Sequence, residues 1–255
     1  MAKATAPRSD RKRRRYCPPP LQDRSHRTLQ RILDATQALL EEHDFDSLSV
    51  GKIARKAGCS VGGFYGRLRD KEALLQALDE RYVERFAEEL EAAWAEAQAA
   101  GRAPAAMIVD TIRLLVGFHR RHRGLVRTLV LRARRPPDRR YREREQRLHA
   151  LMPRFGGLLL AHHASLSHPD PGRAVIVGPA IVFFALREMV LWEHLGAIVG
   201  LGDEELVGEL ARALLAYLGM PSGAAAKKAQ RALESKPIEP MGKPGMGRSP
   251  ARDSK

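Results

Sequence analysis

Apolar residues recur along this 255-residue chain every three or four positions, which is the period of an α-helix with one buried face. Glycine, proline and short polar runs separate these segments and are expected to end the helices. The pattern predicts helices over residues 29–40, 53–57, 60–68, 70–100, 105–119, 125–131, 139–162, 173–195 and 204–218. The predicted fold class is therefore all-α.

The segment 47–75 carries the most specific pattern, which is two short helices joined by a tight turn. Gly58 is expected to end the first of them, because glycine adopts the left-handed conformation at little cost. Ser60 is expected to cap the second helix and Asp70 the one after it. A short helix that follows such a turn, with small and basic exposed residues, can lie in the major groove of DNA. The segment therefore predicts a DNA-binding helix-turn-helix.

The run from Ile32 to Leu78 resembles the DNA-binding domain of the TetR family of bacterial transcriptional regulators. The resemblance implies an N-terminal three-helix helix-turn-helix DNA-binding domain, followed by a helical ligand-binding and dimerisation domain. Beyond this run the chain is similar to the family only in length and helical character. The elements that match the family are Ala35, Leu39, Leu40, Phe45, Leu48, Ile53, Ala54, Ala57, Gly58, Ser60, Gly62, Tyr65, Lys71, Glu72 and Leu74.

The resemblance also implies which residues contact DNA. Tyr65 is expected to be an exposed phosphate contact, and Lys71 is expected to meet a phosphate at the start of its helix. In the predicted recognition helix, Val61 suits a thymine methyl group and Arg67 suits guanine or a phosphate. The residues predicted to contact DNA are Thr28, Val50, Gly51, Ser60, Val61, Gly62, Gly63, Tyr65, Gly66, Arg67 and Lys71.

The recognition helix departs from the family pattern at three positions. Gly63 stands where Thr, Ser or Ala is usual, and Gly66 and Arg67 stand where aromatic or histidine residues are common. Each interior glycine costs a helix about 1 kcal/mol relative to alanine. Glycine also removes a side chain that would touch a base, so the family's base contacts do not transfer to Gly63 or Gly66. The alternative is that these glycines let the backbone approach DNA closely.

The charge of the chain suits a polyanionic partner, because 44 Lys and Arg residues outnumber 30 Asp and Glu residues for a net charge of +14. Much of the excess lies over 8–15 and 120–147. The N-terminal arm is either a flexible clamp that adds salt-dependent affinity for DNA or a solvated tail. The predicted organisation is a disordered basic arm over 1–23, a helix-turn-helix DNA-binding domain over 24–70, a helical ligand-binding and dimerisation domain over 71–220 and a disordered tail over 221–255.

The apolar run 174–186 is expected to be a helix that is buried on all sides. It is shorter than the roughly 20 residues that a membrane-spanning helix needs. In the resembled family the last two helices pack against their symmetry mates, and this helix and 204–218 match that pair. A homodimer would place two recognition helices about one DNA turn, roughly 34 Å, apart. A core helix of a monomer is the alternative.

Pro179 is expected to kink the apolar helix. A kink beside aromatic side chains can open a pocket for a small molecule, and the resemblance implies that such a ligand changes the separation of the recognition helices. The effector is predicted to be apolar or aromatic, or an acid such as an acyl chain, whereas the alternative interpretation is that these side chains are ordinary core. The predicted pocket residues are Trp94, Met107, Phe118, Phe155, Phe183 and Trp192.

The sequence contains no pattern that predicts catalysis, a metal site or a cofactor. Cys17 and Cys59 match no zinc or redox spacing, and no carboxylate or cysteine accompanies His119 and His122 as a further metal ligand. Two functions remain. The first is a cytoplasmic, ligand-responsive, dimeric repressor of a palindromic operator. The second is a less selective architectural DNA-binding protein in which the arginine-rich segments supply most of the affinity.

Overall fold

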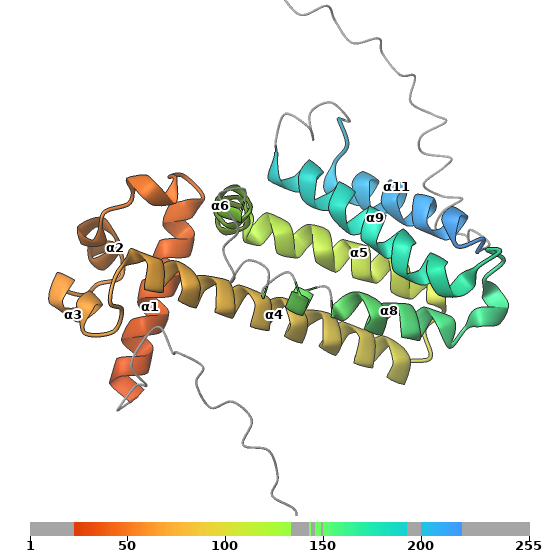
Figure 1. Cartoon of the computed structure of the whole chain (residues 1–255), viewed down its shortest axis with the longest axis horizontal. Helices are drawn as coiled ribbons and strands as arrows, with labels where there is room; N and C mark the ends of the chain where they lie inside the picture. The colour runs from red at the N-terminus through yellow and green to blue at the C-terminus, as the bar shows by residue number, and fades with distance from the viewer. Residues whose placement is uncertain (1–22, 134–142, 144–145, 149, 193–199, 221–255) are drawn as a thin grey trace, which may run out of the picture.

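The computed structural model of the chain describes residues 23–133, 143, 146–148, 150–192 and 200–220. Those residues form helices joined by turns and contain no β-strand, which confirms the predicted all-α fold class. The helices, shown in Figure 1, are α1 (Asp23–Leu40), η1 (Phe45–Ser47), α2 (Val50–Lys56), α3 (Val61–Tyr65), α4 (Lys71–Ala99), α5 (Pro104–Arg121), α6 (Arg123–Ala133), α8 (Leu151–Leu160), η2 (His163–Ser165), α9 (Pro171–Leu191) and α11 (Asp203–Tyr217).

The helices α1, α2 and α3 gather at one end of the molecule around the first turns of α4 (Figure 1). Their inward residues are almost fully removed from water, as the apolar pattern predicts. Burial of several large aliphatic and aromatic side chains stabilises these short helices, which would be marginal alone. The fully buried residues of this core include Ile32, Leu40, Leu48, Ile53, Phe64, Leu68, Leu74 and Leu78.

The predicted caps of the helix-turn-helix are confirmed. The Ser60 hydroxyl accepts a hydrogen bond from the Gly63 backbone N–H at 2.9 Å, and the Asp70 carboxylate accepts one from the Ala73 backbone N–H at 2.7 Å. The hydrogen bond from Ala73 lowers the pKa of the Asp70 carboxyl below its ordinary value. Gly58 ends α2 with a φ of 62°, in the left-handed region. The turn and the caps therefore fix the direction of α3.

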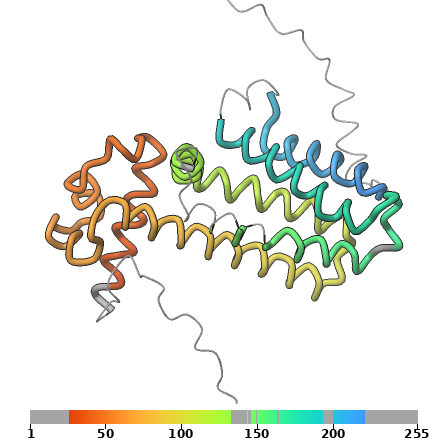
Figure 2. The backbone as a smooth tube through the Cα atoms, in the orientation of Figure 1, coloured from red at the N-terminus to blue at the C-terminus, as the bar shows by residue number. Residues whose placement is uncertain are grey.

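The helix α4 joins the two domains and, at 29 residues, is the longest described helix (Figures 1 and 2). Its first turns pack against α1, where the Arg81 guanidinium donates to the Asp34 carboxylate at 2.6 Å. Its later turns bury aromatic and aliphatic side chains in the second domain, again at the spacing that the sequence predicts. Those residues are Tyr82, Phe86, Leu90 and Trp94.

The second domain is a bundle in which α5, α8, α9 and α11 pack on one another and on α4 (Figure 2). Pro179 lies inside α9, as expected. Proline has no N–H group, so the Val175 carbonyl loses its ordinary partner within the helix. The bundle core consists almost entirely of aliphatic and aromatic side chains.

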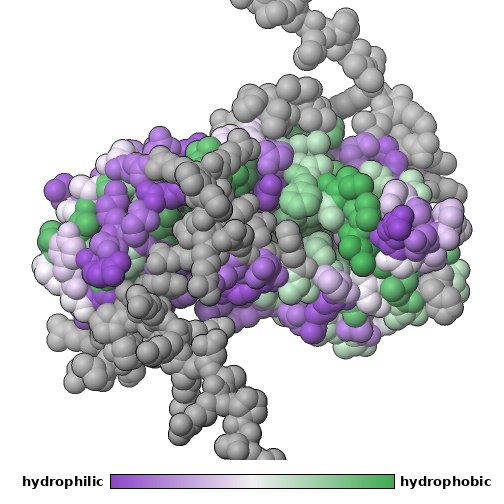
Figure 3. Space-filling model, in the orientation of Figure 1, coloured by the Kyte–Doolittle hydropathy of each residue, from purple (hydrophilic) through white to green (hydrophobic). Residues whose placement is uncertain are grey.

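The expectation that α9 is buried on all sides is wrong. Ile176, Ile181 and Phe184 are exposed on one face of α9, while Val182 and Leu186 are buried on the other. The helix begins two residues earlier than expected, at Pro171, and ends at Leu191. It is long and apolar enough to cross a membrane by length and composition. It packs instead against α5, α8 and α11. On the face seen in Figure 3, hydrophobic surface gathers over the bundle and hydrophilic surface predominates over the DNA-binding domain.

An interruption of the chain's helix near Pro153 was expected, and the structure contains one. Residues 146–148 are helical, Ala150 is a turn, and α8 begins at Leu151. Pro153 lies in the first turn of α8, where its missing N–H costs no hydrogen bond within the helix. Most of the basic stretch that was expected to precede it lies outside the described residues, as does the predicted tail over 221–255. Of the predicted arm over 1–23, only Asp23 is described, and it is the first residue of α1.

Candidate nucleic-acid interface and ligand pocket

The recognition helix α3 presents a small, mostly apolar outer face. Val61 is 46% exposed and Tyr65 is 53% exposed. Phe64 lies between them in sequence but is fully buried, and its ring packs edge-on against the Tyr65 ring with the centroids 5.4 Å apart. The backbone caps and this aromatic contact hold Tyr65 in place while its side chain faces outward. The expectation of an exposed tyrosine is therefore confirmed, whereas its contact with phosphate stays a prediction.

The two cations predicted to contact DNA are engaged with protein carbonyl groups. The Arg67 guanidinium donates to the Gly63 carbonyl at 3.1 Å, which turns the side chain back along α3. The Lys71 ammonium donates to the carbonyl groups of Phe45 and Asp46 at 2.8 and 3.3 Å. Lys71 therefore ties the start of α4 to η1. An ammonium group has three donors, so a contact with phosphate is compatible with these bonds.

The remaining predicted DNA contacts lie around α3. The Thr28 side chain is buried and accepts a hydrogen bond from Arg31 at 3.4 Å. Val50 and Gly51 are half-buried in the first turn of α2, and Ser60, Gly62 and Gly66 are exposed. The structure thus brings every predicted contact except Thr28 to the surface of one small domain.

Three cations on α2 were not predicted from the sequence as DNA contacts. Lys52, Arg55 and Lys56 are exposed, on the sides of α2 that face away from buried Ile53 and Ala54. Basic side chains beside a recognition helix suit contacts with DNA phosphates, which position a protein on the duplex. The helical period of the buried residues is the signal that predicts their exposure.

The helix α6 docks on the DNA-binding domain through a surface that we call the α6 contact, made of Gly124, Arg127 and Arg132. The Gly124 N–H donates to the Glu41 carboxylate at 3.1 Å. Gly124 lies so close to α1 that a Cβ atom there would be 2.1 Å from the Leu40 carbonyl oxygen. The α6 contact therefore admits only glycine at this position without movement of the backbone.

Charged pairs complete the α6 contact. Arg132 donates to the Asp46 carboxylate at 2.5 Å and to the Glu72 carboxylate at 2.6 Å, and Arg127 donates to Asp44 at 3.4 Å. These carboxylates belong to η1, to the residue before it and to the first turn of α4, next to the helix-turn-helix. Movement of α6 would therefore displace η1 and the first turn of α4, which lie next to α3.

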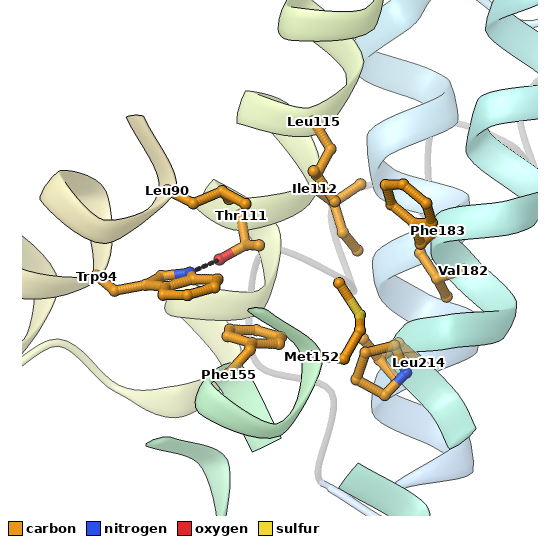
Figure 4. A pocket seen from close by; sticks show the side chains of 11 residues that line it. Leu90, Trp94, Thr111, Ile112, Leu115, Met152, Phe155, Val182, Phe183 and Leu214 are labelled. Carbon is orange, nitrogen blue, oxygen red and sulfur yellow. Dashed lines mark hydrogen bonds between the residues drawn. The ribbon is translucent and has the colours of Figure 1, made fainter. Parts of the chain in front are cut away.

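An apolar pocket lies in the second domain between α4, α5, α8, α9 and α11 (Figure 4). The Trp94 and Phe155 rings stack with their centroids 5.3 Å apart, and the Trp94 indole N–H donates to the Thr111 hydroxyl at 3.0 Å. The free volume is about 20 Å³, which is room for about one water molecule. A larger ligand would have to displace the lining side chains, which are Leu90, Trp94, Thr111, Ile112, Leu115, Met152, Phe155, Pro179, Val182, Phe183 and Leu214.

The structure brings three of the six predicted pocket residues, Trp94, Phe155 and Phe183, to this pocket. Phe118, Met107 and Trp192 do not line it. Phe118 belongs to an aromatic cluster that adjoins the pocket at Phe183, through the Phe86 ring. Met107 is buried elsewhere in α5, and the Trp192 indole N–H donates to Glu188 at 2.9 Å. The sequence could not distinguish the residues that line the pocket from those that do not, because both groups have the spacing of a buried helical face.

The aromatic cluster of Tyr82, Phe86 and Phe118 surrounds two buried histidines. His119 is fully buried, and its Nδ1 lies 2.8 Å from the Leu115 carbonyl oxygen. Burial lowers the pKa of His119 and of His122 to about 4 in each case, so both rings are neutral near pH 7. Among the described residues there is no group of three or more side chains that suits a metal ion.

A family model and solved structures both relate this chain to bacterial transcriptional regulators. Residues 32–78 match the model of the bacterial regulatory proteins of the tetR family. No curated protein matches the chain in sequence. Solved structures share its fold at low sequence identity, including three bacterial regulators.

A TetR-family transcriptional regulator from Mesorhizobium loti is similar with a TM-score of 0.59 at 17% identity, covering 78% of this chain and 98% of that one. The fatty acid degradation regulator FadR from Bacillus halodurans has a TM-score of 0.56 at 19% identity, covering 73% and 97%. A bacterial regulatory protein of the tetR family from Rhodococcus RHA1 has a TM-score of 0.58 at 15% identity, covering 76% and 98%. The resemblance to the TetR family of transcriptional regulators is therefore confirmed, by the family model over residues 32–78 and by the shared fold of the described helices.

Proposed function

We propose that this protein is a homodimeric, ligand-responsive repressor that binds a palindromic operator. The observation that carries the proposal is the outer face of α3, where Val61 and Tyr65 are exposed on a helix that is capped, docked and free of covering residues within the described chain. A helix presented in this way by a helix-turn-helix lies in the major groove of DNA. Charged residues of α2 flank it and supply phosphate contacts.

The exposed face of α9 supports a homodimer. Ile176, Ile181 and Phe184 form an apolar surface beside α11, and exposed surfaces of this kind mark interaction sites. The isologous contact of a twofold dimer would bury these residues against their own copies. A dimer of this kind presents two α3 helices to one palindrome.

The pocket and the α6 contact support a response to a ligand. Phe183 and Val182 of α9 line the pocket, and α6 packs against both α9 and α1. A ligand that parts α5, α8 and α9 would favour a different position of α6, and hence of the DNA-binding domain. The lining suits an apolar or aromatic body. Since the structurally similar FadR is a fatty acid degradation regulator, fatty acids are the first compounds to test.

The repressor function predicts a cytoplasmic protein that acts on the bacterial nucleoid. A less selective architectural protein is the second candidate, and the observation that favours it is the net charge of +14, much of it over 8–15 and 120–147. Such a protein would bind DNA with a steep salt dependence and little sequence preference.

Selection of the purified protein on random double-stranded DNA at about 150 mM salt separates the two functions. The repressor function predicts enrichment of an inverted repeat, with half-sites about one helical turn apart. Retention of DNA without a motif would contradict it and support the architectural function. Removal of residues 1–16 from the same protein then tests the arm: a flatter salt dependence shows a DNA clamp, and an unchanged one shows a solvated tail.

A further inference from the structure

Two glycines that the folded protein does not require lie on the outer side of α3, Gly62 within the helix and Gly66 at its C-cap. Gly62 and Gly66 are exposed, and neither has a positive φ. A Cβ atom on Gly62 would meet only the Ser60 hydroxyl at 3.9 Å, and one on Gly66 would meet the Gly62 carbonyl at 3.4 Å. Both are ordinary contacts, so alanine fits at either position. Alanine in place of a glycine within a helix, such as Gly62, favours folding about fivefold.

Gly63 differs from these two glycines, because the fold explains it. A Cβ atom there would lie 3.2 Å from the Ser60 hydroxyl oxygen, which is the atom that caps α3. Gly62 and Gly66, in contrast, have room for a Cβ atom, so no contact in the folded protein explains why these positions are glycine. A residue that weakens the free protein without a folded-state reason is expected to serve the bound state.

The side chains beside these glycines are apolar or turned away from the groove. Val61 and Tyr65 are four residues apart, as are Gly62 and Gly66, so the two pairs form neighbouring rows on α3. Arg67, the nearest side chain suited to guanine, donates to the Gly63 carbonyl. Gly62 and Gly66 are therefore exposed to solvent beside the methyl groups of Val61. The helix α3 itself carries no side-chain amide or guanidinium group that could hydrogen-bond to guanine or adenine.

We propose that Gly62 and Gly66 are specificity-determining residues, which let the backbone of α3 approach the floor of the major groove and receive thymine methyl groups beside Val61. The thymine methyl is the apolar feature of the major groove, and a smooth apolar surface recognises it without hydrogen bonds. The operator half-site is then rich in A·T pairs at the positions under α3. This inference rests on the proposed function, since it concerns how the same helix reads its operator.

The first test uses the unaltered protein and the operator obtained by selection. Thymines under α3 are replaced one at a time by deoxyuridine, which lacks only the methyl group. Loss of one contacted methyl is expected to weaken binding about fourfold. The same replacement in the spacer between half-sites serves as the control and is expected to leave affinity unchanged. Half-sites dominated by guanine, or an affinity that deoxyuridine does not change, would overturn the inference.

The second test uses the variants Gly62→Ala and Gly66→Ala. Gly62→Ala is expected to raise the thermal midpoint by about 2–4 °C, whereas Gly66→Ala, at the C-cap, is expected to change it less. Both variants are expected to weaken operator binding about tenfold, because the new methyl holds the helix off the groove. Gly157→Ala is the matched control, since Gly157 is an exposed glycine of α8 with open space around a Cβ atom. It is expected to raise the midpoint and to leave DNA binding unchanged.

The outcomes separate this inference from the proposed function. Enrichment of an inverted repeat together with equal affinity of the glycine variants and wild type would overturn the role of Gly62 and Gly66 while the repressor function stands. Absence of any enriched motif would overturn both. Weaker binding by a more stable variant supports the inference, because loss of folding does not explain it.

Discussion

The bundle of the second domain and the α6 contact with the DNA-binding domain are held together by different forces. Aromatic and aliphatic side chains fill the bundle, as in the contact between the Phe86 and Phe118 rings, whose centroids lie 5.0 Å apart. In the α6 contact, Arg127 and Arg132 form ion pairs and Gly124 lies against the backbone of Leu40, while α6 also buries aliphatic side chains such as Leu125. Burial of a large apolar side chain contributes about 1.5–3 kcal/mol to the free energy of unfolding, whereas a partly exposed ion pair contributes about 0–1 kcal/mol. The bundle therefore fixes the fold, while the ion pairs of the α6 contact can be exchanged at small cost.

The largest expected effect comes from breaking the bundle at Phe86. Phe86 is almost fully buried between Tyr82, Phe118 and Phe183. Phe86→Ala is expected to lower the free energy of unfolding by about 4 kcal/mol, because it removes buried apolar area and leaves a cavity. Denaturant titration measures the loss. Leu160→Ala, at a partly exposed position of α8, is the control, and an equal loss in the two variants would contradict the account of the bundle.

Acid is expected to weaken the bundle through His119. The pKa of this buried histidine is lowered from 6.5 to about 4, so below pH 6.5 the unfolded chain binds a proton that the folded chain excludes. The free energy of unfolding should fall by about 3 kcal/mol between pH 6.5 and pH 4 on account of this group. His122, whose pKa is also lowered to about 4, acts in the same direction.

The variant His119→Leu tests this pH dependence. It removes the titrating group, so the unfolding free energy is expected to change less between pH 7 and pH 4 than in wild type. The free energy of unfolding of the variant, relative to that of wild type, should consequently rise as the pH falls. Denaturant titrations at the two pH values give the comparison, and parallel pH profiles of wild type and variant would show that His119 does not titrate as inferred.

The α6 contact can be broken sterically at Gly124. A Cβ atom there would meet the backbone of Leu40, not a movable side chain. Gly124→Ala is expected to lower the free energy of unfolding by about 2 kcal/mol and to separate α6 from α1. Hydrogen exchange should increase in α6 and at the end of α1 while the bundle core stays protected. Unchanged exchange in α6 would show that the backbone accommodates the methyl group.

The smallest effect is expected from the charges of the α6 contact. Arg132→Gln removes ion pairs with Asp46 and Glu72 and should lower the free energy of unfolding by about 0.5–1 kcal/mol at low salt. The difference from wild type should shrink in about 1 M salt, which screens such pairs. Arg113→Gln, which removes an ion pair with Glu204 inside the second domain, is the control for hydrogen exchange in α6. Equal exchange in the two variants would contradict the proposed role of Arg132.

The two domains also differ in how far the sequence predicts them. Local signals sufficed for the DNA-binding domain, because Gly58, Ser60 and Asp70 act on residues at most three positions away. The helices of the second domain were predicted as well, together with the buried row from Tyr82 to Trp94.

The contacts between distant segments were not predictable from such signals. Gly124 carries no sign in the sequence that it meets the backbone of Leu40, 84 positions before it. Helical spacing likewise did not separate Phe155, which lines the pocket, from Phe118, which does not. The exposed face of α9 was missed for the same reason, since Ile181 and Val182 are equally apolar and only packing exposes one and buries the other. Arg67 and Lys71 were recognised as cations, but their bonds to protein carbonyls depend on the tertiary structure.

The most direct test of the central claim, that the outer face of α3 binds DNA, is the operator affinity of Tyr65→Ala. Operator affinity is expected to fall about tenfold, with helical content and dimerisation as in wild type, because Tyr65 is 53% exposed. Leu131→Ala, at a 44% exposed apolar residue of α6, should bind the operator like wild type. Wild-type affinity of Tyr65→Ala would contradict the claim, and so would an unfolded variant, which would show that Tyr65 supports the core rather than the DNA contact.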